Sequence, residues 1–374
     1  MEIDRRALLA GIAAQLSTAG WRPPALAAAN QSILAANVRT ANKEFAAVLY
    51  SIERGILRQV ALPGRGHDIA VSSATGACVS FARRPGNFAV AFSTDNSQPP
   101  TLLSTPANRH FYGHGVFSPD GRLLYTTEND FEGSRGCIGI WDATDEYHRI
   151  GELPSYGVGP HDINLLQDGR TLVVANGGIV THPDFGRRPM NLSSMEPSIV
   201  YVDSQTGDLM ESQKLPPELH KLSIRHLEMA ARDTVVFGCQ QKGPKSAKVG
   251  LIGFHRLGQD LQLNDYDPNV ARALRHYVSS IAVDRSGETA AFTSSRGQKA
   301  VIIDVSTRKL RAIHSHADAS GVASSAQPHA FVVTGGSGDV AVLSTNGRKR
   351  RLPRRHTWNW DNHAVHLHRQ VYNP

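Results

Sequence analysis

The sequence predicts an all-β protein: a seven-bladed β-propeller closed by pairing of N-terminal strands with a C-terminal strand. Three observations support this fold. Short apolar runs alternate with turns, in keeping with 33 Gly and 20 Pro among 374 residues. No long amphipathic helical pattern follows the N-terminus. One unit of sequence recurs along the chain, and its last copy is truncated, so that strands from elsewhere are needed to complete it.

The repeating unit is clearest between Phe111 and Asp142. A Gly-His pair at 113–114 opens this stretch, and the Ser-Pro-Asp-Gly sequence at 118–121 separates two apolar runs. An Ile-Trp-Asp run at 140–142 closes the unit. Pro and Gly favour tight turns, so the apolar runs on either side of 118–121 are predicted to form antiparallel strands.

Seven copies of the unit are found when their first strands are aligned. Their reference residues are His67, His114, His161, His226, Ser279, Gly321 and His363. The steps between them are 47, 47, 65, 53, 42 and 42 residues. A period of roughly 40 to 50 residues fits four-stranded propeller blades of the WD40-like kind. The longest step contains an insertion at about 181–197, whose Pro, Arg, Met and Asn content predicts a loop on one face.

The two ends of the chain are predicted to share one blade. Residues 363–367 supply the opening strand of the seventh copy, with too little sequence behind them for three more strands. Residues 46–62 read as two strands that lack an opening strand. Pairing these segments would tie the chain ends together and remove an open sheet edge. Residues 29–374 are therefore predicted to form a single propeller domain.

Residues 1–28 are predicted to be a twin-arginine export signal. Arg5 and Arg6 precede an apolar segment at 7–16, and the Ala-Leu-Ala sequence at 25–27 offers a cleavage site. The apolar segment is too short to span a bilayer, and no later stretch approaches that length. We therefore expect a periplasmic protein with no transmembrane segment in its mature form. An N-terminal helix of a cytoplasmic protein is the alternative.

Charge and cysteine content narrow the possible partners. The net charge of +7 comes partly from a basic run at 348–355, which is expected to be a solvated loop or, alternatively, a contact for an acidic partner. No nucleic-acid-binding motif accompanies the run, so no nucleic-acid partner is expected. Cys78, Cys137 and Cys239 form no metal motif. Buried free thiols are expected, with one disulfide as the alternative.

Several runs resemble the bacterial family called domain of unknown function 1513. They lie at 65–67, 81–86, 112–118, 128–130, 159–161, 175–178, 181–184, 225–227 and 360–363. The resemblance covers essentially the whole mature chain. It implies an exported seven-bladed propeller of the YVTN and quinoprotein amine dehydrogenase-like type, with a role near iron uptake and periplasmic iron-uptake proteins as partners. It implies no known reaction. The cysteine usual in the family near Gly321 is here Ser320 or is absent, so no thiol role is expected there.

Five of the seven copies place a histidine at the reference position: His67, His114, His161, His226 and His363. The first strand of each blade lines the central channel of a propeller, so these side chains are predicted to converge into a ring at one mouth. Neutral imidazole can bind Cu, Fe, Zn or Ni, and we expect iron or copper. Asp68 and Asp162 would orient a ring nitrogen. The alternative is that each histidine is structural, as in WD-type blades.

Other candidate residues lie near this mouth. Arg65, Arg83, Arg84 and Arg225 predict an anionic ligand, such as a carboxylate chelate or phosphate. His182, with Asp184 in the insertion, is a further candidate ligand-binding residue, although the favoured interpretation of this segment is a surface loop. The acidic run 128–132 is expected either to hold a cation or to cap strand ends.

Three functions remain open at this stage. The first is a binding protein for a metal ion, a metal chelate or a small anion, without turnover. The second is a metal-dependent oxidoreductase or hydrolase, with Glu228 as general base. The third is an interaction scaffold that docks through the basic run. The chain contains no GxSxG, GxxxxGK or HExxH motif, so binding is favoured over catalysis.

Overall fold

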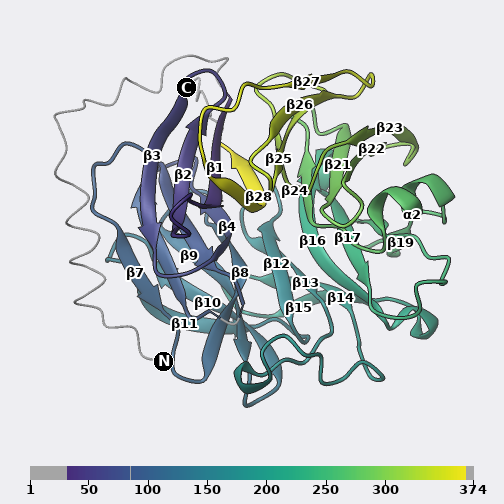
Figure 1. Ribbon diagram of the computed structural model, residues 1–374. Coiled ribbons are helices and arrows are strands. Elements are labelled where there is room, and N and C mark those ends of the chain that lie inside the picture. The colour runs from purple at the N-terminus through teal and green to yellow at the C-terminus, as the bar shows by residue number, and fades with distance from the viewer. Residues whose placement is uncertain (1–31, 85, 368–374) are drawn as a thin grey trace.

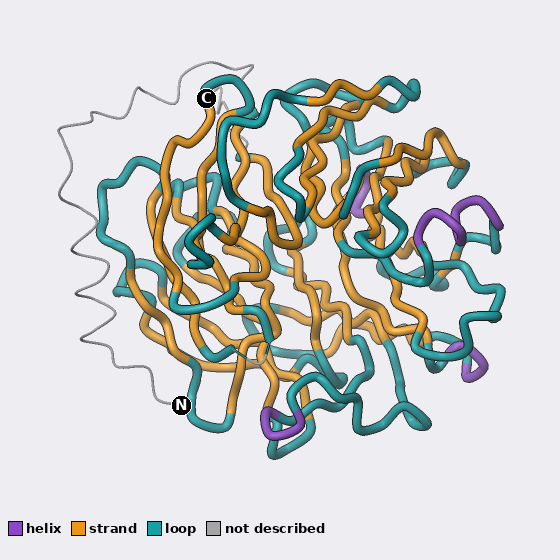
Figure 2. The backbone as a smooth tube through the Cα atoms, viewed as in Figure 1, coloured by secondary structure: helices purple, strands orange, loops and turns teal. Residues whose placement is uncertain are grey.

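Seven four-stranded antiparallel sheets surround a central axis in the computed structural model, which describes residues 32–84 and 86–367 (Figures 1 and 2). In each sheet the strands follow one another from the axis outward. The prediction of an all-β, seven-bladed propeller is confirmed. The predicted export signal at 1–28 lies outside the described residues.

The first four blades follow the chain in order. Blade 1 comprises β4 (Gly66–Val71), β5 (Ala77–Ala82), β6 (Phe88–Ser93) and β7 (Thr101–Ser104). Blade 2 comprises β8 (Arg109–Phe117), β9 (Leu123–Asp130), β10 (Arg135–Asp142) and β11 (His148–Pro154). Blade 3 comprises β12 (Pro160–Leu165), β13 (Thr171–Asn176), β14 (Ser198–Asp203) and β15 (Leu209–Lys214). Blade 4 comprises β16 (Leu222–Ala230), β17 (Thr234–Gln241), β18 (Ile252–His255) and β19 (Gln262–Leu263).

The remaining blades complete the circle. Blade 5 comprises β20 (Ser280–Val283), β21 (Thr289–Ser294), β22 (Lys299–Asp304) and β23 (Leu310–Ser315). Blade 6 comprises β24 (Ala319–Ser324), β25 (Ala330–Gly335), β26 (Val340–Ser344) and β27 (Lys349–Arg351). Blade 7 comprises β28 (Asn359–His366), β1 (Ile33–Arg39), β2 (Phe45–Ser51) and β3 (Gly55–Leu62).

The predicted turn between the first two strands of the unit is present in the structure. The backbone N–H of Gly121 donates to the Ser118 carbonyl over 2.9 Å, with Gly121 at φ 73°. Gly169 and Gly287 make the same closure in blades 3 and 5, with φ angles of 67° and 74°. These left-handed conformations suit Gly because it has no Cβ. Recurrent turn chemistry thus sets the inner hairpin of several blades.

The core lies between neighbouring blades. Second strands such as β13, β21 and β25 are buried along their whole length, whereas the outer strand β15 is mostly exposed. Each second strand is covered on both faces by adjacent sheets, which explains its nearly continuous apolar sequence. The fold therefore holds the inner strands, and the side chains that they direct at the axis, on a rigid support.

Closure of the ring occurs as predicted, with one strand more than expected. β28 pairs antiparallel with β1, placing Trp360 opposite Val38 and His366 opposite Leu34 (Figure 1). The strands predicted for this blade, at 46–62 and 363–367, do not include β1. The strand Ile33–Arg39 is rich in small residues, and no Gly or Pro turn introduces it, so its pattern carried little signal.

Two further features differ from expectation or were not foreseen. The basic run is not simply a loop, because Lys349–Arg351 forms β27, the outer strand of blade 6. The short helix α2 (Pro268–Leu274), capped by Asp267, precedes blade 5.

The three cysteines are buried free thiols, as expected. Among the described residues, no helix has the length and apolar character needed to cross a membrane.

Candidate metal centre

Each of the five predicted histidines lies where its inner strand departs from regular pairing. In blade 1 the register passes from Gly66↔Ala82 to Ile69↔Ser80, so that His67 and Asp68 face a single residue. Comparable shifts occur at His114, at His161, beside His226 and at His363. A bulge bends the strand and redirects a side chain, and bulges are frequent next to functional sites. The irregularities therefore turn the imidazoles toward the axis.

The five imidazoles come together in one cluster, which we call the histidine cluster. His114 occupies its middle, with ring centroids 4.9 Å from His67, 5.1 Å from His161, 5.4 Å from His226 and 4.9 Å from His363. The four outer rings follow one another at 4.5 to 5.7 Å. The cluster thus brings together residues that lie far apart in the sequence, from His67 to His363, as the repeat predicted.

Small residues complete the circle where no histidine is present. In blade 5 the Ser280 hydroxyl lies 3.1 Å from Nδ1 of His363. In blade 6 a Cβ on Gly321 would come within 2.9 Å of the His363 backbone. The two blades without a histidine therefore provide the space and one hydrogen-bond partner that His363 requires. The role of Ser280 and Gly321 was not predicted, because an alignment of the sequence copies shows only that blades 5 and 6 lack a histidine.

Two carboxylates hold the central imidazole. Nδ1 of His114 lies 2.9 Å from Oδ2 of Asp68 and 3.2 Å from Oδ1 of Asp162. Both aspartates follow a cluster histidine directly in the sequence, yet both contact the histidine of blade 2. A carboxylate on one ring nitrogen directs the other nitrogen toward a metal ion in many metal sites. Here that other nitrogen, Nε2, has no partner.

Most of the cluster's inward nitrogen atoms lack hydrogen bonds. The buried ring nitrogens without a partner are His67 Nδ1, His114 Nε2, His161 Nδ1, both nitrogens of His226, and His363 Nε2. The nearest carboxylate oxygen to His226 Nδ1 is 3.8 Å away, too far for a hydrogen bond. Leaving a buried polar group unsatisfied costs about 1–3 kcal/mol. Structural histidines would instead be expected to bond their own strands or turns.

The spacing of these nitrogens suits a metal ion. Ligand atoms of His67, His114 and His161 all lie within 4.8 Å of one another. The same holds for His114, His226 and His363. His114 belongs to both groups, so the two candidate sites share their central ligand. Imidazole nitrogen is a donor suited to copper, iron, nickel and zinc.

Electrostatics keep four of the five imidazoles in the neutral form that binds metals. Burial and the neighbouring cationic groups hold the pKa values of His67, His161 and His226 well below the usual 6.5. Burial lowers the pKa of His363 to about 3. Burial also opposes protonation of His114, but Asp162 and Asp68 outweigh it and raise its pKa to about 10. The central residue alone therefore favours the charged form.

An acidic group lies farther along the same strands. Glu228, two residues after His226, accepts a hydrogen bond from Asn164 over 3.3 Å. Burial raises its pKa to about 7, and the Asp162 and Asp68 carboxylates act in the same direction. A carboxyl pKa raised toward neutral pH is the condition that suits a general base or a proton carrier.

The predicted ligand-binding residues divide into three environments. Arg65 and Arg83 both pair with Asp361, at 2.5 and 3.1 Å. Arg84 and Arg225 have no carboxylate partner among the described residues. His182 caps the 3-10 helix Pro183–Phe185 in the insertion, contacting Asp184 at 3.5 Å and Glu132 at 3.6 Å. It belongs to neither metal-capable histidine group.

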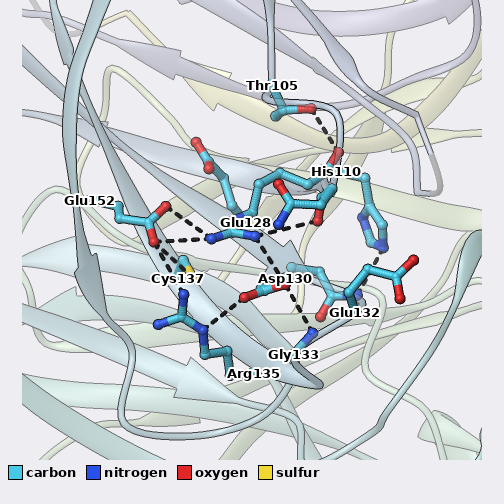
Figure 3. A network of polar contacts seen from close by, with 12 residues as sticks. Thr105, His110, Glu128, Asp130, Glu132, Gly133, Arg135, Cys137 and Glu152 are labelled. Atoms are coloured by element: carbon cyan, nitrogen blue, oxygen red, sulfur yellow. Dashed lines mark hydrogen bonds and ion pairs between the residues drawn. The ribbon is translucent and has the colours of Figure 1, made fainter.

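The acidic run of blade 2 belongs to an ion-pair network instead of forming an obvious cation site (Figure 3). Asp130 accepts from Arg135 over 2.7 Å and pairs with Arg109 at 2.9 Å. Glu128 is fully buried and pairs with Arg149 at 2.8 Å. Because arginine side chains already occupy these carboxylates, the run acts structurally within blade 2.

A pocket of about 590 Å³ lies elsewhere, between turns of blades 4 and 5. Arg232, Arg256 and Arg308 are among its lining residues, together with Glu288 and Asp304. None of the predicted site residues lines it. The chemistry concentrated on the axis is therefore the stronger candidate for a functional site.

Solved structures similar to this chain share the propeller architecture. Kuenenia stuttgartiensis hydrazine synthase matches with a TM-score of 0.62 and 14% identity, over 80% of this chain and 89% of that one. The β-propeller domain of Myceliophteria thermophila Cps50 (Swd1) matches with 0.56 and 12%, over 82% and 96%. A chain of the mitotic checkpoint complex matches with 0.55 and 10%, over 77% and 76%. At these identities the likeness concerns the fold alone.

No curated protein matches the chain. A family model does match, across residues 60–367, and therefore includes every inner strand and all five cluster histidines. The chain belongs to the family described as "Protein of unknown function (DUF1513)".

Proposed function

We propose that this protein binds a first-row transition-metal ion, iron or copper, in the histidine cluster. The observation that carries the proposal is the set of buried ring nitrogens without hydrogen-bond partners. A metal ion would accept lone pairs from three or more of them and remove the cost of their burial. Asp68 and Asp162 would fix the orientation of His114, as carboxylates do for metal-bound imidazoles.

The setting of this activity is part of the same proposal. The sequence of residues 1–28 favours twin-arginine export, a route that carries folded proteins, so folding or metal loading would take place in the cytoplasm before transfer to the periplasm. The family resemblance favours a role beside iron-uptake proteins. Elemental analysis of protein recovered from the periplasm would identify the metal. Recovery of the protein only from the cytoplasm would contradict the export proposal.

The metal proposal is tested by removing two ligands. The metal-free chain would be titrated with Cu²⁺ and Fe²⁺ by calorimetry, and bound metal would be counted by elemental analysis. His114→Ala/His161→Ala removes the ligand that both candidate triads share and a second ligand of one of them, so affinity is expected to fall about 100-fold. His148→Ala/His220→Ala, at sites outside the cluster, is expected to bind as wild type does.

A single conservative variant distinguishes loss of metal binding from misfolding of the double variant. His161→Gln keeps a polar side chain of similar length at a position whose Nδ1 has no partner to lose. It is expected to retain the circular dichroism spectrum while binding metal more weakly. Unchanged metal stoichiometry in both cluster variants, or no stoichiometric metal in the wild type, would overturn the proposal.

A second candidate function is metal-dependent catalysis. It is favoured by Glu228, whose raised pKa of about 7 suits a general base beside the cluster. Metal-loaded protein would be assayed against lactone, phosphoester and redox substrates. Turnover that is lost in Glu228→Gln while metal binding persists would establish an enzyme. Metal retention without turnover supports the binding function instead.

A further inference from the structure

Four cationic side chains outside the histidine cluster originate from the same face of the propeller. Arg84 follows β5, Arg187 lies between β13 and β14, and Lys242 follows β17. The register pairs the ends of these second strands with the beginnings of the inner strands, as in Gly66↔Ala82, Pro160↔Asn176 and Leu222↔Gln241. Arg225 extends from β16 itself, directly before His226. The four therefore surround the mouth nearest the cluster.

Direct contacts join two of these cations, Arg84 and Arg187. Nε and Nη2 of Arg187 each donate to the Arg84 carbonyl over 3.2 Å, which joins the insertion to blade 1. The Arg84 guanidinium lies over the Tyr112 ring, 5.0 Å from its centroid. Tyr112 is itself buried two residues before His114. The insertion thus brings Arg187 to the backbone of Arg84, whose side chain covers a ring on the inner strand of blade 2.

Anionic partners are missing from this cationic set. The Asp361 carboxylate is occupied by Arg65 and Arg83. Among residues 32–84 and 86–367, none of the ion pairs involves Arg84, Arg187, Arg225 or Lys242. Nη1 of Arg84 and Nε of Arg225 are buried and have no hydrogen-bond partner. Unpaired buried guanidinium nitrogens are costly, so they point to a ligand that supplies acceptors.

The closeness of these cationic groups also affects the pKa values of the loop residues Arg187 and Lys242. Burial lowers the pKa of Arg187 to about 10, and Arg83 and Arg84 add to the effect. Burial lowers the pKa of Lys242 to about 7, with Arg225 and Arg84 as further causes. An anion bound among these groups would raise both pKa values toward their ordinary range and favour the charged form of Lys242 at neutral pH.

We propose that Arg84, Arg187, Arg225 and Lys242 form an oxyanion site for a small, multiply charged carboxylate or phosphate at the channel mouth. Guanidinium groups match the paired oxygens of both ligand classes in a bidentate manner. Because Arg225 and His226 are adjacent, the oxyanion would bind next to the proposed metal ion. The site goes beyond metal binding, since the metal-free protein would also bind the anion.

The experiment uses metal-free full-length protein and calorimetry with citrate or inorganic phosphate. Arg84→Gln/Arg225→Gln is expected to weaken binding of the preferred anion about 10- to 100-fold, the loss of charge-assisted hydrogen bonds. Arg350→Gln/Arg351→Gln on β27 removes the same net charge away from the mouth and is expected to bind as wild type does. The anion that binds with the higher affinity, citrate or phosphate, identifies the ligand class.

A second variant covers the case in which the first fails to fold. Arg187→Gln/Lys242→Gln changes only loop residues and is expected to weaken anion binding in the same way. His114→Ala/His161→Ala is expected to retain citrate or phosphate binding without metal, so that failure of the metal proposal stays distinguishable. Absence of binding by either anion, or equal weakening by the β27 variant, would overturn the oxyanion site.

Discussion

Gly113 shows how closely the backbone of blade 2 is fitted to a cluster histidine. Its φ of 108° is a conformation that side-chain-bearing residues rarely adopt, and a Cβ there would lie 2.5 Å from Cδ2 of His67. Gly113→Ala is therefore expected to lower the free energy of unfolding by about 1–3 kcal/mol. Displacement of the His67 ring should also weaken metal binding. Urea denaturation of metal-free protein and calorimetry would measure the two effects.

Gly151→Ala is the matched control for this substitution. Gly151 lies on β11, where an added Cβ would meet only Ile140 Cδ1 at 3.9 Å. It is expected to leave the free energy of unfolding and the metal affinity nearly unchanged. Equal effects of the two substitutions would show that the fit around Gly113 does not matter.

The residues that the sequence predicted best are those repeated at one position. The five histidines could be grouped because each lies on an inner strand, and inner strands meet at the axis. The partners of those residues were less accessible to prediction. Asp68 and Asp162 contact His114 on another blade, which depends on how far each bulge rotates its strand. Arg187 and Lys242 lie in loops, where no repeat fixes the register.

At the level of elements, the turn sequences made the hairpins of the blades predictable. The irregular strand pairing at the histidines could not be predicted from the sequence. Ser-Pro-Asp-Gly at 118–121 indicates a hairpin from sequence alone. The bulges at the histidines replace regular alternation, so a period of two residues would misplace the side chains that matter most. The missed strand β1 illustrates the other limit, because its pattern becomes meaningful only through β28 at the far end of the chain.

Strand β28 joins the closure of the ring to the candidate site. Trp360 is 3% exposed, packs 5.3 Å from the Tyr50 ring and lies three residues before His363. Trp360→Ala is expected to cost about 3–5 kcal/mol of unfolding free energy, since it opens a cavity between β28 and β2. A large drop in the urea midpoint would be the readout. Phe185→Ala, at a side chain 55% exposed, should leave the midpoint in place. A small effect of Trp360→Ala would imply that closure contributes little stability.

Across the whole molecule, groups that could hold a cation and groups that could hold an anion occupy neighbouring parts of the inner strands. Asp68 and Asp162 contact His114 within the histidine cluster, whereas Arg225 directly precedes His226 on β16. A cation is attracted to the carboxylates of the cluster, and an anion to the arginine and lysine side chains at the mouth. The sequence indicates which blade carries each of these residues, but the strand bulges decide which of them meet.

The whole molecule is also expected to lose stability in mild acid, for a reason that includes histidines outside the cluster. Burial lowers the pKa of His110 to about 4, and burial does the same for His316 and His356. These groups take up protons more readily when unfolded, where the pKa is about 6.5. Their contribution to stability is therefore present above pH 6.5 and is lost as the pH falls toward 4. For His110, which is 2% exposed, the shift corresponds to about 3 kcal/mol.

Urea denaturation of metal-free protein between pH 8 and pH 4 would measure this loss. The unfolding free energy should be nearly level down to about pH 7 and then fall steeply, because several buried histidines act in the same direction. His110→Asn should make the fall shallower, since one proton-binding group is gone, whereas His148→Asn at an exposed site should leave the slope unchanged. If stability stayed level to pH 4.5, the buried imidazoles would have to be protonated in the folded protein. The neutral form of the four outer cluster histidines would then be in doubt as well.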